Sequence, residues 1–334
     1  MTGIMDLFVH FQSISYWMIA AARKYFSLFL LFIVVPGIAF ANEQNLYFDK
    51  QISVSSFAGY RLDDLSWNIA GNLNGSSPNI LSELEWESLR VLQVGFQGEF
   101  NFSNTIFPSI STYFLFEAGL GKILDGENRD SDYGGDNRTQ EVSRILSSTN
   151  SGETQDVSAA LGPHFAIKEK KFSVVPLMGY AQNKQYLNLT NGFRVIPNLG
   201  HITGLDSTYE TKWRGPWFGF LLKYYFLGKS YIFTRFDYHW VNYYAKADWN
   251  LRSDFNHPLS FEHEADGEGT VYIIGLHYIL NQKWAIGIKS SYQSWVTGSG
   301  TDRVFFADGT VITTRLNKVS WDSFSLNIQL SYNF

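Results

Sequence analysis

The last twelve residues, 323–334, most constrain what this chain can fold into. Apolar or aromatic side chains occupy every second position, and small or polar side chains fill the gaps. Because side chains alternate faces along a β-strand, one face of this strand is wholly apolar and the other wholly polar. This pattern is typical of a transmembrane β-barrel strand, with its apolar face towards lipid and its polar face towards the lumen. The last four apolar positions are Ile328, Leu330, Tyr332 and Phe334.

These four positions resemble the C-terminal sorting signal of bacterial outer-membrane proteins, which ends on an aromatic residue. The resemblance implies a Gram-negative outer membrane, with periplasmic chaperones and the barrel-assembly machinery as partners during export. The alternative interpretation is an ordinary amphipathic strand of a soluble sheet.

Composition favours the membrane interpretation. Charged residues make up only 17% of the 334 residues, aromatic residues also make up 17%, and there are 28 glycines. Aromatic rings at this density suit strands that cross two membrane interfaces. The net charge of −5 argues against a nucleic-acid partner. Because the chain has no cysteine, it has no disulfide, no thiol nucleophile and no cysteine metal site.

The amino-terminal segment has the three parts of a secretory signal peptide. Arg23 and Lys24 precede an apolar run at 25–35, and Ala39 and Ala41 form an A-x-A cleavage site. We therefore predict cleavage after Ala41, which divides the chain into a leader at 1–41 and a single outer-membrane β-barrel domain at 42–334. The first 17 residues are unusual for such a leader, which suggests that translation starts at Met18.

The remaining chain alternates period-two segments with turns and loops, and no helical period persists. Counting the segments predicts about ten strands, the first at 48–67, the second at 82–101 and the last at the carboxy-terminus. Long polar loops are expected at 71–79, 122–152, 188–206 and 252–266, separated by short turns such as 102–104 and 168–171. The fold class is therefore all-β, a transmembrane antiparallel up-and-down barrel with extracellular loops and both termini in the periplasm.

The final hairpin adds a constraint on register. Asp308-Gly309 predicts a two-residue type I′ turn. Outward-facing residues are even-numbered on both flanking strands, and paired residues must point to the same face. A two-residue turn at 308–309, however, pairs even-numbered with odd-numbered residues. We therefore predict a β-bulge at 298–300, where glycine can adopt the conformation required.

Ten strands lie near the small end of the barrel range, where side chains fill the interior. The polar positions predicted to face the lumen are Glu85, Glu99, Glu117, Arg235, Asp237, His239 and Lys289. Paired charges packed in the lumen are the simplest interpretation of this set. A serine-type catalytic triad at 235–239 is not indicated, because no spacing places a serine beside these residues.

Two short motifs resemble the omptins, ten-stranded outer-membrane surface proteases. Residues 82–86, SELEW, are similar to the S-x-L-D-W stretch on the second omptin strand, and 130–133, DSDY, are similar to the omptin D-x-D-W motif. These segments and GYRLDDLSWNIAG at 59–71 resemble the Protochlamydia outer membrane protein family more closely still. Members of that family are regarded as barrel or porin-type proteins, whereas the omptin resemblance implies Asp130 and Asp132 as half of a catalytic site.

The other half of an omptin-like site is an Asp–His pair, in which the histidine acts as general base. The candidate here is Asp254 with His257, spaced one residue wider than the D-x-H of omptins. Residues three apart on an extended chain point to opposite faces, so these two side chains converge only at a bulge. Segment 262–264, EHE, is the other candidate, although His263 has no aspartate two residues before it. An ordinary polar surface turn also accounts for DSDYGG.

We expect neither a cofactor nor a metal site, because the acidic residues of 127–136 lack the spacing of a known calcium loop. The predicted function is that of a channel-forming, porin-type or structural surface barrel in the outer membrane. The alternatives are an omptin-type endopeptidase and an adhesin that binds a host surface through its loops. Outer-membrane lipid and lipopolysaccharide are the expected partners.

Overall fold

The computed structural model describes residues 52–103, 110–167 and 171–334. The predicted signal peptide, its cleavage site, the Met18 start and the beginning of the first predicted strand lie outside these residues, as do parts of the turns predicted at 102–104 and 168–171. In the part that the structure describes, no helix is long and apolar enough to cross a membrane.

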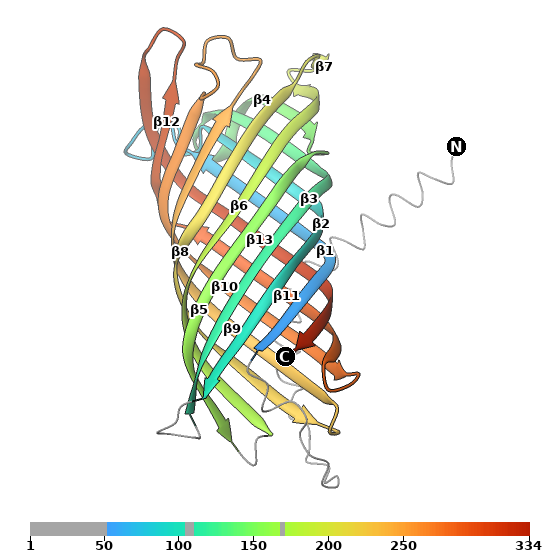
Figure 1. Cartoon of the computed structure of the whole chain (residues 1–334). Helices are drawn as coiled ribbons and strands as arrows, with labels where there is room; N and C mark the ends of the chain where they lie inside the picture. The colour runs from blue at the N-terminus through green and yellow to red at the C-terminus, as the bar shows by residue number, and fades with distance from the viewer. Residues whose placement is uncertain (1–51, 104–109, 168–170) are drawn as a thin grey trace, which may run out of the picture. The chain divides into compact units, whose positions relative to one another are not determined.

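The chain folds into strands joined by short connections (Figure 1). The strands are β1 (Ile52–Ile69), β2 (Ser82–Ser103), β3 (Ile110–Gly135), β4 (Thr139–Ser148), β5 (Gly152–Ile167), β6 (Phe172–Ile196), β7 (Gly200–His201), β8 (Asp206–Phe226), β9 (Ser230–Asp248), β10 (Phe261–Ile279), β11 (Trp284–Thr297), β12 (Gly300–Phe305) and β13 (Val311–Asn333). A single 3₁₀ turn, η2 (Asp136–Arg138), separates β3 from β4.

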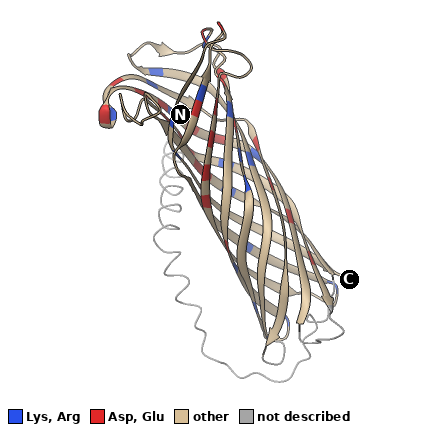
Figure 2. Cartoon of the chain, turned by 90° about the vertical axis from the view of Figure 1, so that its left-hand side faces the viewer, with Lys and Arg blue, Asp and Glu red and all other residues tan. Residues whose placement is uncertain are grey.

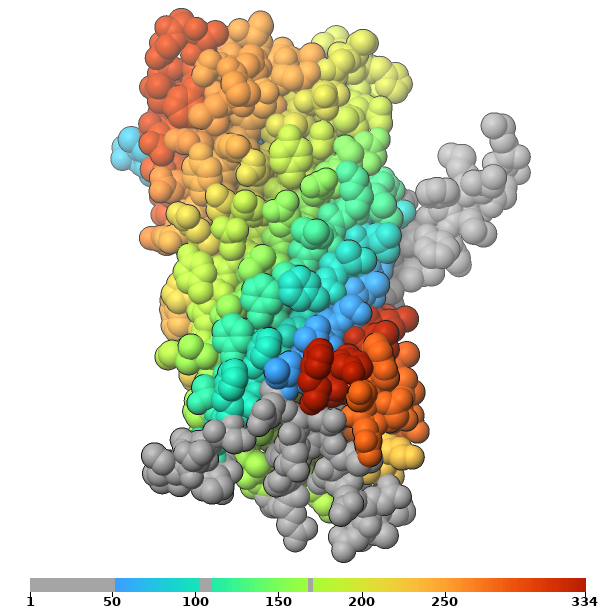
Figure 3. Space-filling view, in the orientation of Figure 1, coloured from blue at the N-terminus to red at the C-terminus, as the bar shows by residue number. Residues whose placement is uncertain are grey.

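The strands close into one antiparallel ring of ten. β4 and β5 share the position between β3 and β6, and β11 and β12 share the position between β10 and β13. The last strand pairs with the first from Ser53–Asn333 to Ile69–Leu316, so the blue and dark red strands lie side by side (Figure 3). The prediction of a ten-stranded, up-and-down antiparallel barrel is confirmed.

Apolar side chains form a belt around the outside of the barrel. Its exposed members include Phe96, Leu120, Leu161, Met178, Phe220, Leu276, Ile288 and Ile328. The belt lies towards the end that carries the short turns 227–229 and 280–283, which we call the short-turn end. Charged residues gather towards the opposite, long-loop end, which carries segments 70–81, 197–205, 249–260 and 306–310 (Figure 2).

Two predicted loops are largely strand, and a third is partly strand. β3 continues to Gly135 and β4 covers 139–148, where a loop at 122–152 was predicted. β6 continues to Ile196, so the loop predicted at 188–206 is much shorter. β10 begins at Phe261, so the loop predicted at 252–266 lies instead at 249–260. The predictions were wrong because polar composition was taken as a sign of loop. Above the apolar belt both faces of a strand can be polar while the backbone ladder still satisfies its hydrogen-bonding groups.

The bulge predicted at 298–300 is absent from the pairing of the last two strands, because Val296 pairs with Ser320 and Gly300 with Leu316 in one unbroken register. The register shifts at 298–300 only on the other side, towards β10. Gly267 pairs with Thr297 and Glu264 with Thr301, so three residues of this strand oppose two of β10. The prediction was wrong because the hairpin tip has a three-residue loop, in which Phe306 N donates to Thr310 O at 2.9 Å. Gly309 adopts φ +88° there, as the type I turn with a G1 bulge requires.

A second bulge corrects one predicted lumen residue. Around Ser88, which has φ 54°, the β1–β2 register shifts between Asp63 and Leu65. Beyond it Trp86 is buried in the lumen, so Glu85 points to the outer face, where it forms an ion pair with Arg129. The prediction that Glu85 faces the lumen was wrong because the displaced residue reverses the alternation.

Candidate functional site

Asp130 and Asp132, which we call the acid pair, face the lumen at the long-loop end of β3. Their cross-strand partners on β2 are Leu84 and Ser82, and Leu84 is completely buried in the lumen core. Because paired residues on neighbouring strands point to the same face, both carboxylates point inwards. They lie beyond the apolar belt, so they belong to the barrel mouth rather than to its membrane-spanning part.

The acid pair shares a proton near neutral pH. Burial, and then the neighbouring carboxylate of Asp132, raise the pKa of Asp130 to about 8. Burial also raises the pKa of Asp132, although a hydrogen bond with Ser82 opposes the shift. Two such close carboxylates titrate together, so the pair can hold one proton and one negative charge. This arrangement can exchange a proton or attract a cationic group.

Segment 249–260 lies over the acid pair. Trp249 forms a hydrogen bond with Asp130, and Arg252 attracts both carboxylates, as does Arg194 of β6. Main-chain bonds hold this segment against the β12–β13 hairpin, from Asn256 N to Phe305 O at 2.8 Å and from Ala307 N to Asp254 O at 2.9 Å. The acid pair therefore faces an anchored loop that carries a guanidinium.

The two residues predicted as an Asp–His pair bind different partners within this segment. Arg252 donates to Asp254 from Nε at 2.9 Å and from Nη2 at 2.8 Å. His257 Nδ1 lies 2.6 Å from Asp248 Oδ1, and its Nε2 lies 3.2 Å from the carbonyl oxygen of Arg252. Asp248, the last residue of β9, was not identified from the sequence because it precedes His257 by nine residues and no short motif links them.

The partners of His257 favour its protonated form. A carboxylate and a carbonyl oxygen can only accept, so each ring nitrogen must carry a hydrogen. The hydrogen bond to Asp248 accordingly raises the pKa of His257. With both nitrogens donating, the ring has no lone pair with which to activate water. Base catalysis by His257 therefore requires that its bond to Arg252 opens.

His263, the other histidine considered from sequence, lies in a buried relay beneath the mouth. Its Nδ1 is 2.9 Å from the Tyr209 hydroxyl, which is 2.7 Å from the Tyr243 hydroxyl. Its Nε2 is 3.2 Å from Asp302 Oδ1 on β12. The fold thus places a carboxylate beside His263 that lies far from it in the sequence. His263 itself is completely buried, so a substrate in the mouth does not reach it.

Aromatic side chains fill the lumen just below the mouth. Trp86 of β2 stacks on Tyr209 of β8 with ring centroids 5.1 Å apart, although these strands lie on different sides of the ring. Trp295 stacks on Trp321 at 5.4 Å, and Trp213 packs against both. This layer separates the acid pair from the charged layer deeper in the barrel.

Ion pairs span the lumen between opposite walls. Lys289 of β11 lies 2.6 Å from Glu117 of β3, and Arg235 of β9 contacts Glu117 and Asp237. The remaining predicted lumen residues also lie here: Glu99 pairs with Lys223 of β8, and His239 is buried against Trp217 and Trp295.

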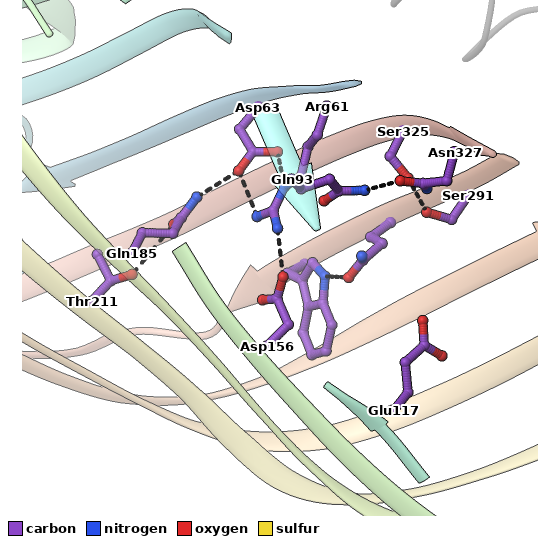
Figure 4. A network of polar contacts seen from close by, with 12 residues as sticks. Arg61, Asp63, Gln93, Glu117, Asp156, Gln185, Thr211, Ser291, Ser325 and Asn327 are labelled. Atoms are coloured by element: carbon purple, nitrogen blue, oxygen red, sulfur yellow. Dashed lines mark hydrogen bonds and ion pairs between the residues drawn. The ribbon is translucent and has the colours of Figure 1, made fainter. Parts of the chain in front are cut away.

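The sequence analysis missed a second network that crosses the lumen. Arg61 of β1 donates to Asp63 at 2.7 and 2.6 Å and to Asp156 of β5 at 2.6 Å (Figure 4). Gln185 of β6 also donates to Asp63 at 2.9 Å. Arg61 and Asp63 lie in GYRLDDLSW, where alternation could have assigned both to the lumen. Among the described residues, no group of three histidine or acidic side chains is arranged to hold a metal ion.

Comparison with solved structures shows the same fold in a known outer-membrane barrel. The outer membrane protease OmpT from Escherichia coli matches with a TM-score of 0.66 and 12% identity, over 85% of this chain and 97% of that chain. The outer membrane protein OprG from Pseudomonas aeruginosa matches with a TM-score of 0.32 and 12% identity, over 85% of this chain and 96% of that chain. At such identities the likeness to OmpT shows the fold alone.

A comparison with curated protein sequences finds no match. The model of one protein family, in contrast, matches residues 56–334, which covers β1 from residue 56 onwards and all the later strands. The barrel, its outer apolar belt and this match agree on an outer-membrane location. The chain belongs to the Protochlamydia outer membrane protein family.

Proposed function

We propose that this protein is a structural surface barrel of the outer membrane that does not conduct solutes, with its long-loop end exposed to the cell exterior. The observation that carries this proposal is the set of ion pairs that joins opposite walls of the lumen. Lys289–Glu117 links β11 to β3, and Arg61–Asp156 links β1 to β5. Such bonds leave no axial path for a solute unless they break.

The space within the lumen supports the same proposal. The cavity beside Arg61, Glu117 and Lys289 has a volume of about 90 Å³. Pockets for small organic ligands measure roughly 300–1,000 Å³. Ten strands also lie closer to the side-chain-filled barrels of about eight strands than to the open channels of about sixteen. The lumen therefore holds a few waters and not a diffusing solute.

Conductance in a planar bilayer tests this proposal directly. We expect the refolded barrel to insert without producing stepwise currents, while a general porin refolded in the same detergent serves as the positive control. Insertion is verified separately by protease protection of the barrel in vesicles. Discrete, reproducible conductance steps from a sample verified in this way would overturn the proposal and favour a porin-type function.

An omptin-type endopeptidase is the second candidate, favoured by one specific observation. Asp130 forms a hydrogen bond with Trp249, the residue that follows Asp248, and Asp248 holds His257. An acid pair and an Asp–His pair are thus brought to the same mouth. For hydrolysis, His257 must release Arg252 and lose a proton before it can accept one from water.

Peptides with paired basic residues test the second candidate, in the presence of lipopolysaccharide. We expect no cleavage by the resting arrangement. Cleavage that disappears in both Asp130→Asn and Asp132→Asn, but persists in Asp308→Asn at a hairpin tip, would establish the peptidase. Absence of both cleavage and conductance is the result expected of a structural barrel, and binding of a host surface by the loops is then the alternative that remains beside it.

The outer wall presents a basic patch for the expected lipid partner. Lys184 of β6 lies directly opposite Lys212 of β8, and Arg214 follows on the same face. Like charges directly opposite each other are unfavourable, and no ion pair involving these three residues occurs in the described part of the chain. They lie just beyond Tyr180 and Trp240, two exposed aromatic residues at the edge of the belt. We propose that phosphate groups of lipopolysaccharide neutralise this patch.

A further inference from the structure

The deep lumen cavity is lined by polar atoms that lack partners. His239 is only 4% exposed, and neither of its ring nitrogens has a hydrogen-bond partner among the described residues. The same holds for one carboxylate oxygen of Asp156 and one of Asp237. All three side chains line the cavity of about 90 Å³. An unsatisfied buried polar atom is destabilising, so an occupant that bonds to several of them would stabilise the barrel.

The charges of the hydrogen-bonded network do not balance once it is followed from the cavity to Asp63, which is bonded to Arg61 but lies outside the cavity lining. Three cationic side chains are present, Arg61, Arg235 and Lys289, and they are joined by hydrogen bonds to four carboxylates, Asp63, Glu117, Asp156 and Asp237. Asp63 and Asp156 both form their ion pair with the same cation, Arg61 (Figure 4). Leaving a buried charge without compensation is strongly unfavourable. The network is therefore short of one positive charge.

We propose that the cavity binds one small monovalent cation that carries several N–H donors, the ammonium ion being the simplest. Its donors would reach the free oxygens of Asp156 and Asp237 and the unprotonated nitrogen of His239. A single added proton would balance the charge but would satisfy only one of these acceptors. Sodium would balance it too, but hard cations favour oxygen ligands and leave the imidazole nitrogen unpaired.

The walls limit the size of the occupant. Trp295 lines the cavity and lies against His239, with its ring centroid 4.8 Å from the imidazole. Lys289 lies over the Phe57 ring, 4.3 Å from its centroid, and both residues line the cavity. Aromatic walls on these sides leave room for an ion the size of a water molecule with its hydration partners. Tetramethylammonium carries the same charge but has no N–H donor.

Salt-dependent stability of the wild-type barrel tests this inference. Urea unfolding is compared at pH 7 in ammonium, sodium and tetramethylammonium chloride at equal ionic strength. A ligand that binds only the folded state at ten times its dissociation constant lowers the unfolding constant about elevenfold. We expect ammonium to produce a saturable decrease of this kind and the other two salts to produce none. Equal stability in the three salts would overturn the inference and leave water as the only occupant.

Two substitutions test whether the ammonium response arises at this cavity. Asp156→Asn removes the excess negative charge, so it should abolish the ammonium response. Glu153→Gln is the matched control on the same strand, because that side chain is 61% exposed on the outer wall, and it should keep the response. If Asp156→Asn does not fold, Asp237→Asn provides the same comparison. An ammonium response that persists in the folded lumen variant would contradict this location.

Discussion

Replacing Arg61 by Met is the sharpest test of a sealed lumen. Arg61 is 2% exposed and makes three charge-assisted hydrogen bonds, two to Asp63 and one to Asp156. Methionine keeps much of the apolar length of the side chain but leaves two carboxylates without their cation. Breaking a buried ion pair by removing one partner costs about 3–5 kcal/mol. We therefore expect the free energy of unfolding to fall by about that amount at neutral pH.

The assay is urea unfolding in lipid vesicles, followed by tryptophan fluorescence, since nine of the ten tryptophans lie in the barrel domain at 42–334. Lys122→Met is the matched control, because Lys122 forms only an outer-wall pair with Glu153 in which both side chains are more than half exposed. Exposed pairs of this kind contribute little to stability, so its midpoint should not move. Equal midpoints for Arg61→Met, Lys122→Met and wild type would refute the reasoning. Such a result would mean that water already screens the Arg61 network, as in an open channel.

Three further outcomes follow from the geometry. The pKa of Asp130 is about 8 in the folded barrel, against an ordinary value of 3.8. Between these values the folded state binds more protons than the unfolded state, so the free energy of unfolding should fall as pH rises from about 4 to about 8. Asp130→Asn should flatten that part of a plot of urea midpoint against pH. Gly162→Ala should impair folding, because the added Cβ would lie 1.8 Å from the Pro176 carbonyl oxygen. Gly298→Ala is the control and should fold normally, because its added Cβ would lie 3.8 Å from the nearest atom. A heat-modifiability gel assay compares the two variants. Charge removal in Lys184→Gln combined with Lys212→Gln should weaken binding of lipopolysaccharide in a vesicle pull-down, and unchanged binding would contradict the assignment of the basic patch.

Strand alternation was sufficient to predict the barrel, its strand number and most of its lumen residues. The residues of 323–334 could be assigned to faces because every apolar position there is even, and the structure keeps that pattern from Phe324 to Phe334. The Arg235–Asp237 pair could also be predicted, since residues two apart share a face.

The candidate site was less accessible from sequence because its partners come from distant strands. His257 binds Asp248 across a loop, and His263 meets Asp302 of β12. A search for D-x-H can find neither pair, since each contact depends on how β9, β10 and β12 are registered above the belt. The acid pair was identified because the resemblance of DSDY at 130–133 to the omptin D-x-D-W motif needs only one short segment of sequence.

The bulges explain how one alternating pattern makes both a lipid-facing wall and a closed mouth. On β2 the large apolar residues keep even positions along most of the strand, yet Leu92 and Phe96 are 54% and 49% exposed whereas Leu84 and Trp86 are buried. The displaced residue near Ser88 turns the even face from the lipid to the lumen. The same stripe of apolar side chains therefore contributes to the belt below the bulge and to the aromatic layer above it. Closure of the lumen follows from where the bulges lie, and the acid pair is separated from the deep ionic network for the same reason.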